Sequence, residues 1–393
     1  MLIDQKENCT GCFACANVCS ANAIKLIENE EGFLYPNIDN AKCLNCGLCY
    51  KVCPVVHPSI CRLPLNIYAV RHMDDNIRIN SSSGGLFTAL AEHALDMGGV
   101  VFGARFNDNW DVVHDYIERK EELALFRGSK YVQSNIRESY RQAETFLKNG
   151  RMVLFSGTPC QVSGLKKYLR KEYDNLLAVD FICHGVPSPK VWQMYLKEEI
   201  AGQDGARSSS TNNHIITNIN FRDKSSGWKN YSLTLNFSKS TFLGEQQSVS
   251  SSMFADNPYM NLFLADIILR KSCYQCKMKS GASNSDCTIG DYWGIDKLDS
   301  HMDDDKGHNI VIVWSDKVEI ENICDIYCVS RKNRYRDIIL QNRSLVDSSK
   351  VNPNRPLFFY YLNKYNSFEK AYNRCFNNSI ISKIFRRILR IFI

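Results

Sequence analysis

Two cysteine runs near the N-terminus constrain this chain more than any other feature. They read Cys9-x2-Cys12-x2-Cys15-x3-Cys19 and Cys43-x2-Cys46-x2-Cys49-x3-Cys53-Pro54. Thiolates at this spacing wrap a short loop around a [4Fe-4S] cluster, and the fourth cysteine of each run ligates the other cluster. The spacing therefore predicts one cluster on Cys9, Cys12, Cys15 and Cys53, and a second on Cys43, Cys46, Cys49 and Cys19.

The alternatives for these runs are a zinc site and a disulfide framework. Zinc sites usually place two ligands together and two further along the chain, rather than three plus one twice over. Disulfide frameworks belong to small secreted chains, and no apolar run typical of a signal peptide precedes Cys9. The 17 cysteines indicate metal ligation in a reducing compartment, so we expect a cytoplasmic protein.

The net charge of +6 is concentrated near the C-terminus, where residues 331–393 carry 14 Lys or Arg against 3 Asp or Glu. A helix over residues 380–393 would place Ile381, Ile384, Phe385, Ile388 and Phe392 on one face and Lys383, Arg386, Arg387 and Arg390 on another. This pattern predicts an interfacial helix at the inner face of the membrane. The alternative is a helix that docks on the body or on a second copy in a homo-oligomer. Because no nucleic-acid motif accompanies the charge, we expect no nucleic-acid partner.

From residue 65 onward the hydrophobic pattern alternates between strands and helices, which predicts parallel neighbouring strands with right-handed crossovers. The predicted strands are 23–27, 32–36, 66–70, 100–106, 110–117, 151–156, 176–182, 219–222, 231–237, 288–293 and 310–314. The predicted helices are 86–97, 136–148, a helix from Cys160 to about 171, and 258–269. Residues 203–218 and 238–252 are rich in Ser, Asn and Thr and are predicted as loops.

These elements predict an α+β fold with the following organisation. Residues 1–60 form a dicluster module, with motifs at about 1–29 and 34–63. Residues 65–148 and 150–325 form two parts of an α/β body with a mixed sheet, and 326–393 form the basic tail.

Four cysteines of the body suggest a third redox site. Cys160 and Cys183 each follow a predicted parallel strand, and ligands gather at the carboxyl ends of such strands. Cys273-x2-Cys276 supplies two further thiolates, so the four suit a third [4Fe-4S] cluster. A four-thiolate zinc site, or structural cysteines beside an unrelated CxxC pair, are the alternatives. Cys287 is the nearest reserve ligand.

Two loops could hold the phosphates of a flavin, the usual two-electron end of an iron–sulfur relay. Ser81-Ser82-Ser83-Gly84-Gly85 precedes a helix and offers backbone and hydroxyl donors. The alternative is a helix with an ordinary serine N-cap, which would have the same sequence pattern. Arg127-Gly128-Ser129-Lys130-Tyr131 offers cations and a ring that can stack on a cofactor, or is a solvated charged loop. Thr158 follows a glycine at a strand end and adds a third donor site.

These motifs resemble those of the coenzyme F-420 hydrogenase/dehydrogenase beta-subunit family, in its bacterial branch with a fused N-terminal ferredoxin domain. The resemblance covers residues 65–315. Its motifs are the two loops above, Ser156-Gly157-Thr158-Pro159-Cys160-Gln161, Cys183-His184-Gly185-Val186-Pro187-Ser188, Phe221-Arg222-Asp223-Lys224, Gly227-Trp228, Cys273-x2-Cys276 and Gly290-Asp291-Tyr292-Trp293-Gly294.

The resemblance implies a flavin- and iron–sulfur-binding body, with FAD beside a [4Fe-4S] cluster on Cys160, Cys183, Cys273 and Cys276. It implies an oxidoreductase that takes electrons from ferredoxin or a reduced coenzyme, in a branch associated with surface-polysaccharide biosynthesis. The alternatives are an electron-transfer subunit that feeds a partner enzyme, and a membrane-surface assembly protein. His184 is the candidate proton donor, or a histidine that only supports a cluster ligand. The cofactor residues that we expect are Ser81, Ser82, Ser83, Gly84, Gly85, Lys130, Tyr131 and Thr158.

Overall fold

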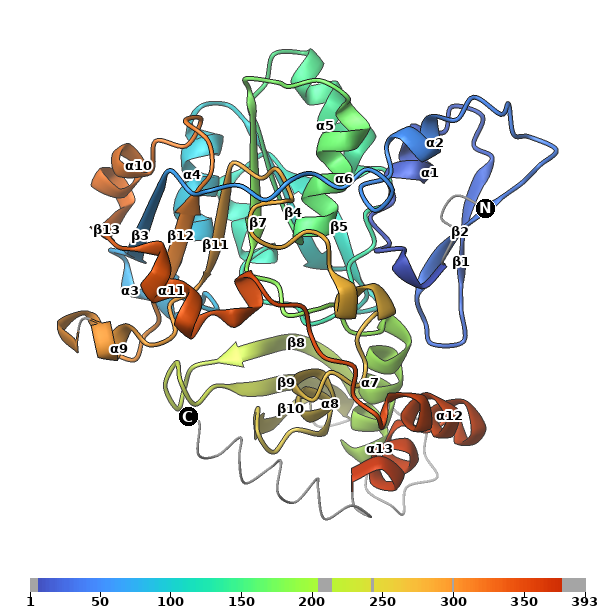
Figure 1. The fold of residues 1–393 in the computed structure, drawn as a ribbon. Coiled ribbons are helices and arrows are strands. Elements are labelled where there is room, and N and C mark those ends of the chain that lie inside the picture. Colours follow the sequence, from blue (N-terminus) through green and yellow to red (C-terminus); the bar gives the residue numbers. More distant parts are fainter. Residues whose placement is uncertain (1–5, 204–213, 242–243, 299, 377–393) are drawn as a thin grey trace.

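The computed structural model describes residues 6–203, 214–241, 244–298 and 300–376, so the predicted tail helix at 380–393 lies outside them. An eight-stranded mixed sheet forms the centre of the molecule. A small N-terminal module lies beside it, and a three-stranded sheet lies below it in Figure 1. This arrangement confirms the predicted α+β class. No helix in the described part of the chain combines the length and the apolar character that a membrane span requires.

The N-terminal module repeats one loop–helix unit. Its elements are η1 (Lys6–Asn8), α1 (Ala14–Val18), β1 (Ile24–Glu28), β2 (Leu34–Ile38) and α2 (Leu48–Lys51). The strands β1 and β2 pair antiparallel. Both helices begin after a residue in the left-handed region, Phe13 at φ 66° and Gly47 at φ 71°. Each cysteine loop therefore turns sharply just before its helix.

The central sheet confirms the predicted alternation of strands and helices. Across the sheet the strands are β13 (Cys328–Lys332), β3 (Asn66–His72), β12 (Asn309–Val313), β11 (Cys287–Asp291), β7 (Leu176–Phe181), β6 (Val153–Gly157), β4 (Val100–Phe106) and β5 (Val112–Ile117). Strands β4, β6, β7 and β11 are parallel to one another, and the remaining pairs are antiparallel. Because β13 pairs with β3, the sheet extends past residue 325, into the region that the sequence assigns to the tail.

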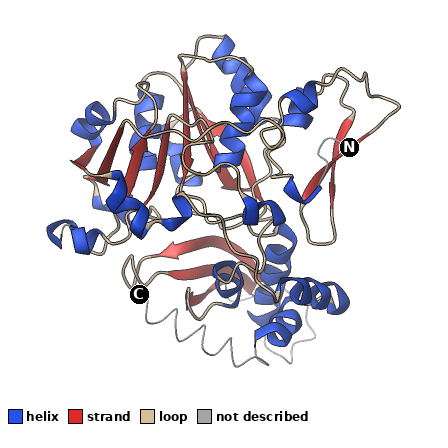
Figure 2. Cartoon of the chain, in the orientation of Figure 1, coloured by secondary structure: helices blue, strands red, loops and turns tan. Residues whose placement is uncertain are grey.

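Helices cover both faces of this sheet (Figure 2). On one face, α4 (Leu86–Asp96) and α10 (Ile320–Tyr327) pack on residues such as Val101 and Val311. On the other face, α5 (Ser139–Lys148), α6 (Pro159–Leu169) and α11 (Tyr335–Gln341) pack on residues such as Phe155 and Ile310. Short elements complete the connections: α3 (Asp75–Ile79), η2 (Lys120–Leu125), α9 (Ile295–Leu298), η4 (Ser300–Met302) and η5 (Arg343–Leu345).

A second layer joins a three-stranded sheet to four helices in one apolar core. Its elements are α7 (Pro189–Gln203), β8 (His214–Asp223), β9 (Ser232–Thr241), β10 (Gly244–Met253), α8 (Pro258–Leu264), α12 (Arg355–Tyr365) and α13 (Phe368–Phe376). The segment η3 (Lys271–Gln275) connects this layer to the central sheet.

Three sequence predictions fail in whole or in part in this second layer. The predicted loop at 238–252 is wrong, because most of it belongs to β9 and β10, and β8 begins inside the other predicted loop. Ser248 and Ser250 of β10 donate hydrogen bonds to Gln203 and Glu199 of α7, so polar contacts fasten a strand that lacks apolar alternation. The helix predicted to reach residue 269 ends at Leu264, because Asp266 adopts φ 60°.

Candidate functional site

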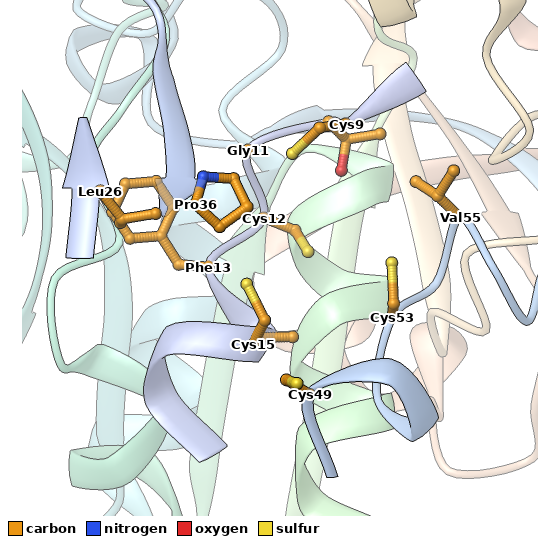
Figure 3. Close-up of a pocket in the computed structure, with 12 residues that line it drawn as sticks. Cys9, Gly11, Cys12, Phe13, Cys15, Leu26, Pro36, Cys49, Cys53 and Val55 are labelled. Atoms are coloured by element: carbon orange, nitrogen blue, oxygen red, sulfur yellow. The ribbon is translucent and has the colours of Figure 1, made fainter. Parts of the chain in front are cut away.

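The sequence spacing assigns the N-terminal cysteines to two groups, which we call the inner site (Cys9, Cys12, Cys15 and Cys53) and the outer site (Cys19, Cys43, Cys46 and Cys49). Figure 3 shows the inner cysteines around one small cavity, which they reach from the α1 loop and from the segment after α2, and Cys49 of the outer site lines the same cavity. Cys9, Cys12 and Cys53 are buried, whereas Cys46 is exposed. The inner site is therefore enclosed, and the outer site reaches the surface.

The electrostatics of these thiols follow the crossed arrangement that the spacing predicts. Burial raises the pKa of Cys12, and Cys15, Cys53 and Cys9 raise it further. Burial also raises the pKa of Cys49, with further contributions from Cys46 and Cys19. Each run thus has the fourth cysteine of the other run as its neighbour.

Four cysteines from three segments meet at the ends of β6 and β7, and we call this group the body site. Cys160 lies in the first turn of α6, Cys183 follows β7, Cys273 lies in η3 and Cys276 directly follows η3. Burial raises the pKa of Cys183, and the other three cysteines raise it further. Burial raises the pKa of Cys160 to about 11 and that of Cys273 to about 12. The structure therefore brings together the four cysteines singled out from the sequence.

The loops around the body site supply donors to its sulfurs. The Val186 N–H donates to Cys273 Sγ at 3.4 Å, and Thr158 Oγ1 lies 3.1 Å from Cys160 Sγ. Within the described ranges, no three or more His, Cys, Asp or Glu side chains converge at single-ion distances. Cys287 is fully buried in the core between the sheet and α4, so it packs there and does not join the body site.

Helix α6 brings the inner site close to the body site. A Cβ added to Gly164 would lie 2.9 Å from Cys12 Cβ, so the cysteine loop rests directly on this helix. Cys160 lies four residues earlier on α6, which is about 6 Å along the helix axis. About one helical turn therefore separates the contact of the inner site from a cysteine of the body site.

A cavity of about 600 Å³ opens beside the body site, and we call it the main cavity. This volume lies within the usual range for small-molecule sites. Its wall includes Cys183 and most of the residues predicted for the cofactor and catalysis, namely Ser81, Ser82, Ser83, Gly85, Lys130, Tyr131, Thr158 and His184. The main cavity thus touches a four-cysteine group and the predicted phosphate loops together.

Gly84 serves packing rather than the main cavity, which it does not line. A Cβ at this position would lie 2.6 Å from Asn309 N and 2.7 Å from Val70 O. Gly85 caps α4 at φ 86°, and Asn309 Oδ1 accepts a hydrogen bond from Leu86 N. The two glycines therefore allow the serine loop to lie against β3 and β12.

Lys130 and Lys224 shape loops with their ammonium groups. Lys130 Nζ donates to the carbonyls of Phe126, Arg127 and Gly128 at 3.0 to 3.4 Å. Burial lowers its pKa to about 7. Lys224 Nζ donates to the carbonyls of Arg78, Ser83 and Lys306. Both ammonium groups donate to backbone carbonyls, and Lys130, which the sequence predicts as a cofactor contact, also lines the main cavity.

One end of the main cavity has the character of an anion site. Ser82 Oγ accepts a hydrogen bond from Ser129 N at 2.5 Å, which joins the two predicted phosphate loops. Arg127 lines this end and donates to Thr88 Oγ1 at 3.2 Å. Among the described residues, Arg127 has no carboxylate partner. Its guanidinium is thus available to an anionic ligand.

The other end is aromatic and lies next to Cys183. Tyr131 stacks on Phe263 at 4.7 Å, and His184 meets Phe263 edge-on at 5.1 Å. Arg222 Nη1 donates to Asp291 Oδ2 at 2.9 Å and to Tyr131 Oη at 3.2 Å. Arg222 is buried, and its Nε and Nη2 have no hydrogen-bond partner in the described part of the chain. Arg222 belongs to the motif Phe221-Arg222-Asp223-Lys224, but the sequence alone does not indicate its role.

His114 is a residue of the main cavity that sequence reasoning missed. Its Nε2 lies 3.0 Å from Ser156 O and its Nδ1 lies 2.9 Å from Ser134 Oγ, so the neutral ring donates through Nε2. Gln161 donates to Ser134 Oγ and accepts from Thr158 N. This chain of hydrogen bonds fixes the turn that carries Cys160. The only sequence signal was a histidine within a predicted strand, which is too common to indicate a role.

Comparisons with known proteins identify the domains of this chain. Residues 67–139 match the model "Coenzyme F420 hydrogenase/dehydrogenase, beta subunit N-term", and residues 150–321 match the corresponding C-terminal model. Residues 8–56 match the 4Fe-4S dicluster domain.

Two individual proteins are also similar to this chain. A coenzyme F420-dependent sulfite reductase of Methanocaldococcus jannaschii is 25% identical over 161 residues, which are 40% of this chain and 25% of that protein. The match therefore spans about a quarter of the relative. A chain of the F420-reducing [NiFe] hydrogenase complex from Methanosarcina barkeri aligns over 78% of this chain and 90% of its own, at 16% identity and a TM-score of 0.44. Together, the two beta-subunit models and the dicluster model show that this chain belongs to the coenzyme F420 hydrogenase/dehydrogenase beta-subunit family and carries a 4Fe-4S dicluster domain at its N-terminus.

Proposed function

We propose that this chain is an iron–sulfur flavoprotein oxidoreductase. Electrons enter at the outer site, pass through the inner site and the body site, and reach FAD in the main cavity, where a second substrate is reduced or oxidised. The observation that carries the proposal is the shared wall of the main cavity. One space is bounded by Cys183 of the body site and by the loops at Ser82 and Arg127.

The donor set of each cysteine site suits an iron–sulfur cluster. The inner site and the body site each offer four thiols in a largely buried setting, where unpaired thiolates would be unfavourable. A [4Fe-4S] cluster takes four thiolates and carries single electrons when bound. Because the outer site is exposed at Cys46 and the inner site is enclosed, an electron donor such as ferredoxin or a reduced coenzyme would reach the outer site first.

The main cavity fits a flavin dinucleotide in chemistry as well as size. Ser82, Ser129 and Arg127 would hold its phosphates, and the aromatic end near Tyr131 would hold its ring system. The unpartnered Nε and Nη2 of Arg222 would donate to carbonyl or ring-nitrogen acceptors of that ring. The flavin would supply two-electron chemistry to a chain whose other cofactors carry one electron at a time. His184 would hold a proton at the same end.

The test is the cofactor content of the full chain purified without oxygen. We expect bound FAD, about twelve irons with matching sulfide, and no stoichiometric zinc. The FAD absorbance should bleach when reduced ferredoxin is added. A protein with about eight irons and no flavin would contradict the proposal, and four-thiolate zinc would give zinc in place of the missing iron.

Turnover separates this function from that of an electron-transfer subunit. An oxidoreductase with its own substrate pocket should reoxidise its flavin when the substrate is added to the chain alone. Sulfite and coenzyme F420 are the first compounds to try, since the matched relative carries both in its name. Reoxidation only in the presence of a second protein would favour the subunit role.

A further inference from the structure

Arg270 is a fully buried cation at the junction of the N-terminal module and the body. Its side chain is 0% exposed. The guanidinium donates to Cys9 O at 2.6 Å, to Leu34 O at 2.9 Å and to Gln133 Oε1 at 3.0 Å. All three acceptors are neutral, and no carboxylate in the described part of the chain forms an ion pair with Arg270.

The side chains around Arg270 are arranged so that they accommodate its positive charge. Its guanidinium lies over the rings of Tyr35 at 4.3 Å and Phe33 at 5.4 Å. A Cβ added to Gly11 would lie 2.9 Å from Arg270 Nη1, so this glycine lets the cysteine loop approach the guanidinium. Gln133 in turn donates to Thr10 O at 3.0 Å. The inner cysteine loop is therefore held by the guanidinium and by its hydrogen-bond partner.

The backbone of Arg270 forms hydrogen bonds with residues of the body site and its neighbouring loop. Arg270 N donates to Val186 O, and Arg270 O accepts from Cys273 N at 2.9 Å. Val186 N is also the donor to Cys273 Sγ. Arg270 thus fixes the turn that carries one cysteine site while its side chain reaches into the other.

An isolated buried cation is unfavourable unless an anion compensates it. Arg355 offers the comparison within the same interface, because it is buried and forms a bidentate ion pair with Glu31 at 2.6 and 2.7 Å. Arg270 has no such carboxylate. The available negative charge is that of the two cysteine sites, since four thiolates bring more negative charge than the iron–sulfide core brings positive charge.

We infer that Arg270 is the shared counter-cation of the inner site and the body site, and that it raises the reduction potentials of the clusters that these sites hold. The inference rests on the proposed function, because it requires iron–sulfur clusters in both sites. A fixed positive charge stabilises the reduced cluster more than the oxidised one, since reduction adds negative charge. Arg270 is a positioning and charge-compensating residue and contacts no substrate.

The experiment compares the full-length wild type with Arg270→Met, Arg270→Lys and the double variant Glu31→Gln, Arg355→Gln. Each protein is purified without oxygen, its iron and sulfide are counted, and its clusters are titrated with reductant under EPR. We expect Arg270→Met to keep its iron and to shift cluster potentials to more negative values. Arg270→Lys should lie close to the wild type. The double variant removes an ion pair of zero net charge from the same interface and should leave the potentials unchanged.

Each possible result either supports or overturns the proposed role of Arg270. Unchanged potentials in an Arg270→Met protein with full iron would overturn it, as would an equal shift in the double variant. If Arg270→Met loses iron while Arg270→Lys retains it, the positive charge is required to hold the clusters, which supports the inference. Loss of iron in both variants would assign Arg270 a purely structural role and overturn it. A wild type without clusters would instead refute the proposed function itself.

Discussion

The imidazole of His184 lies with its Nε2 2.6 Å from Asp266 Oδ1, beside Cys183 and on the wall of the main cavity. Asp266 adopts φ 60° directly after α8, and Ser349 donates a hydrogen bond to the His184 carbonyl. The ring is thus fixed between a carboxylate and the edge of Phe263. The contact is a close approach of the two charged-group atoms rather than a hydrogen bond, and it holds the imidazole beside a carboxylate at the cavity wall.

His184→Gln should retain FAD and iron while slowing flavin turnover by about 100-fold or more, because a positioned general acid contributes about 10²–10⁴ in rate. Stopped-flow measurement of flavin reoxidation checks this. Asp266→Asn is the matched control, since Asn tolerates the left-handed backbone and keeps a polar neighbour. It should slow turnover less than the His184 variant. Full activity in His184→Gln would leave that histidine a supporting role only.

His114 should make stability depend on pH. Burial lowers its pKa to about 4, below the value of about 6.5 in an unfolded chain. Between these values the unfolded state binds more protons, so the free energy of unfolding should fall as pH drops from 6.5 to 4, by about 3 kcal/mol from this residue.

Urea unfolding across that pH window measures the effect of His114. His114→Gln should show a shallower loss of stability than the wild type, because glutamine does not titrate. His308, whose pKa burial also lowers to about 4, remains in both proteins and contributes equally to both curves. Parallel curves for the two proteins would show that His114 does not titrate as described.

Removal of one body-site thiol should remove one cluster and no other. Cys273→Ser is expected to lower the iron content by about a third, from about twelve to about eight per chain. Cys287→Ala is the control, because Cys287 is fully buried in the core away from the body site. The control should keep all its iron and lose only stability. Equal iron in Cys273→Ser and the wild type would remove the third cluster from the proposal.

Gly84→Ala should release FAD. The new Cβ would meet the backbone atoms Asn309 N and Val70 O at 2.6 and 2.7 Å, so the serine loop must move by enough to disturb the main cavity. We expect about 1–3 kcal/mol of destabilisation together with a lower FAD-to-protein ratio.

Gly202→Ala is the matched control for that substitution. Gly202 lies in α7, and a Cβ there would have no atom within 4 Å, so alanine should stabilise the helix by up to about 1 kcal/mol. A wild-type FAD ratio in Gly84→Ala would show that the serine loop does not hold the flavin.

The parts that the sequence predicted well are those set by local pattern. The cysteine spacing places each loop around its own site, because three ligands lie within seven residues. The parallel pairing of β6 and β7 followed from the strand–helix–strand order, and it brought Cys160 and Cys183 to one edge of the sheet. The position of Cys273 could be argued only from its chemistry.

The parts that failed depend on contacts between distant segments. Arg270 contacts Cys9, which lies 261 positions away in the sequence, and no residue pattern near Arg270 predicts that contact. Strand β10 has no apolar alternation because α7 satisfies its serines. In each case the partner, rather than the residue type, decides the role.

The ion pair between Arg355 and Glu31 has a consequence for the order of biosynthesis. It joins positions 324 residues apart, so the N-terminal module leaves the ribosome roughly 15 to 60 seconds before the arginine that clamps it. Arg270 also arrives late. Until Arg270 has been made, the body cannot fully cover the inner cysteines, which leaves a time window in which cluster-delivery proteins can reach them. Once α6 and Arg270 have docked on the cysteine loop, the same cysteines are enclosed.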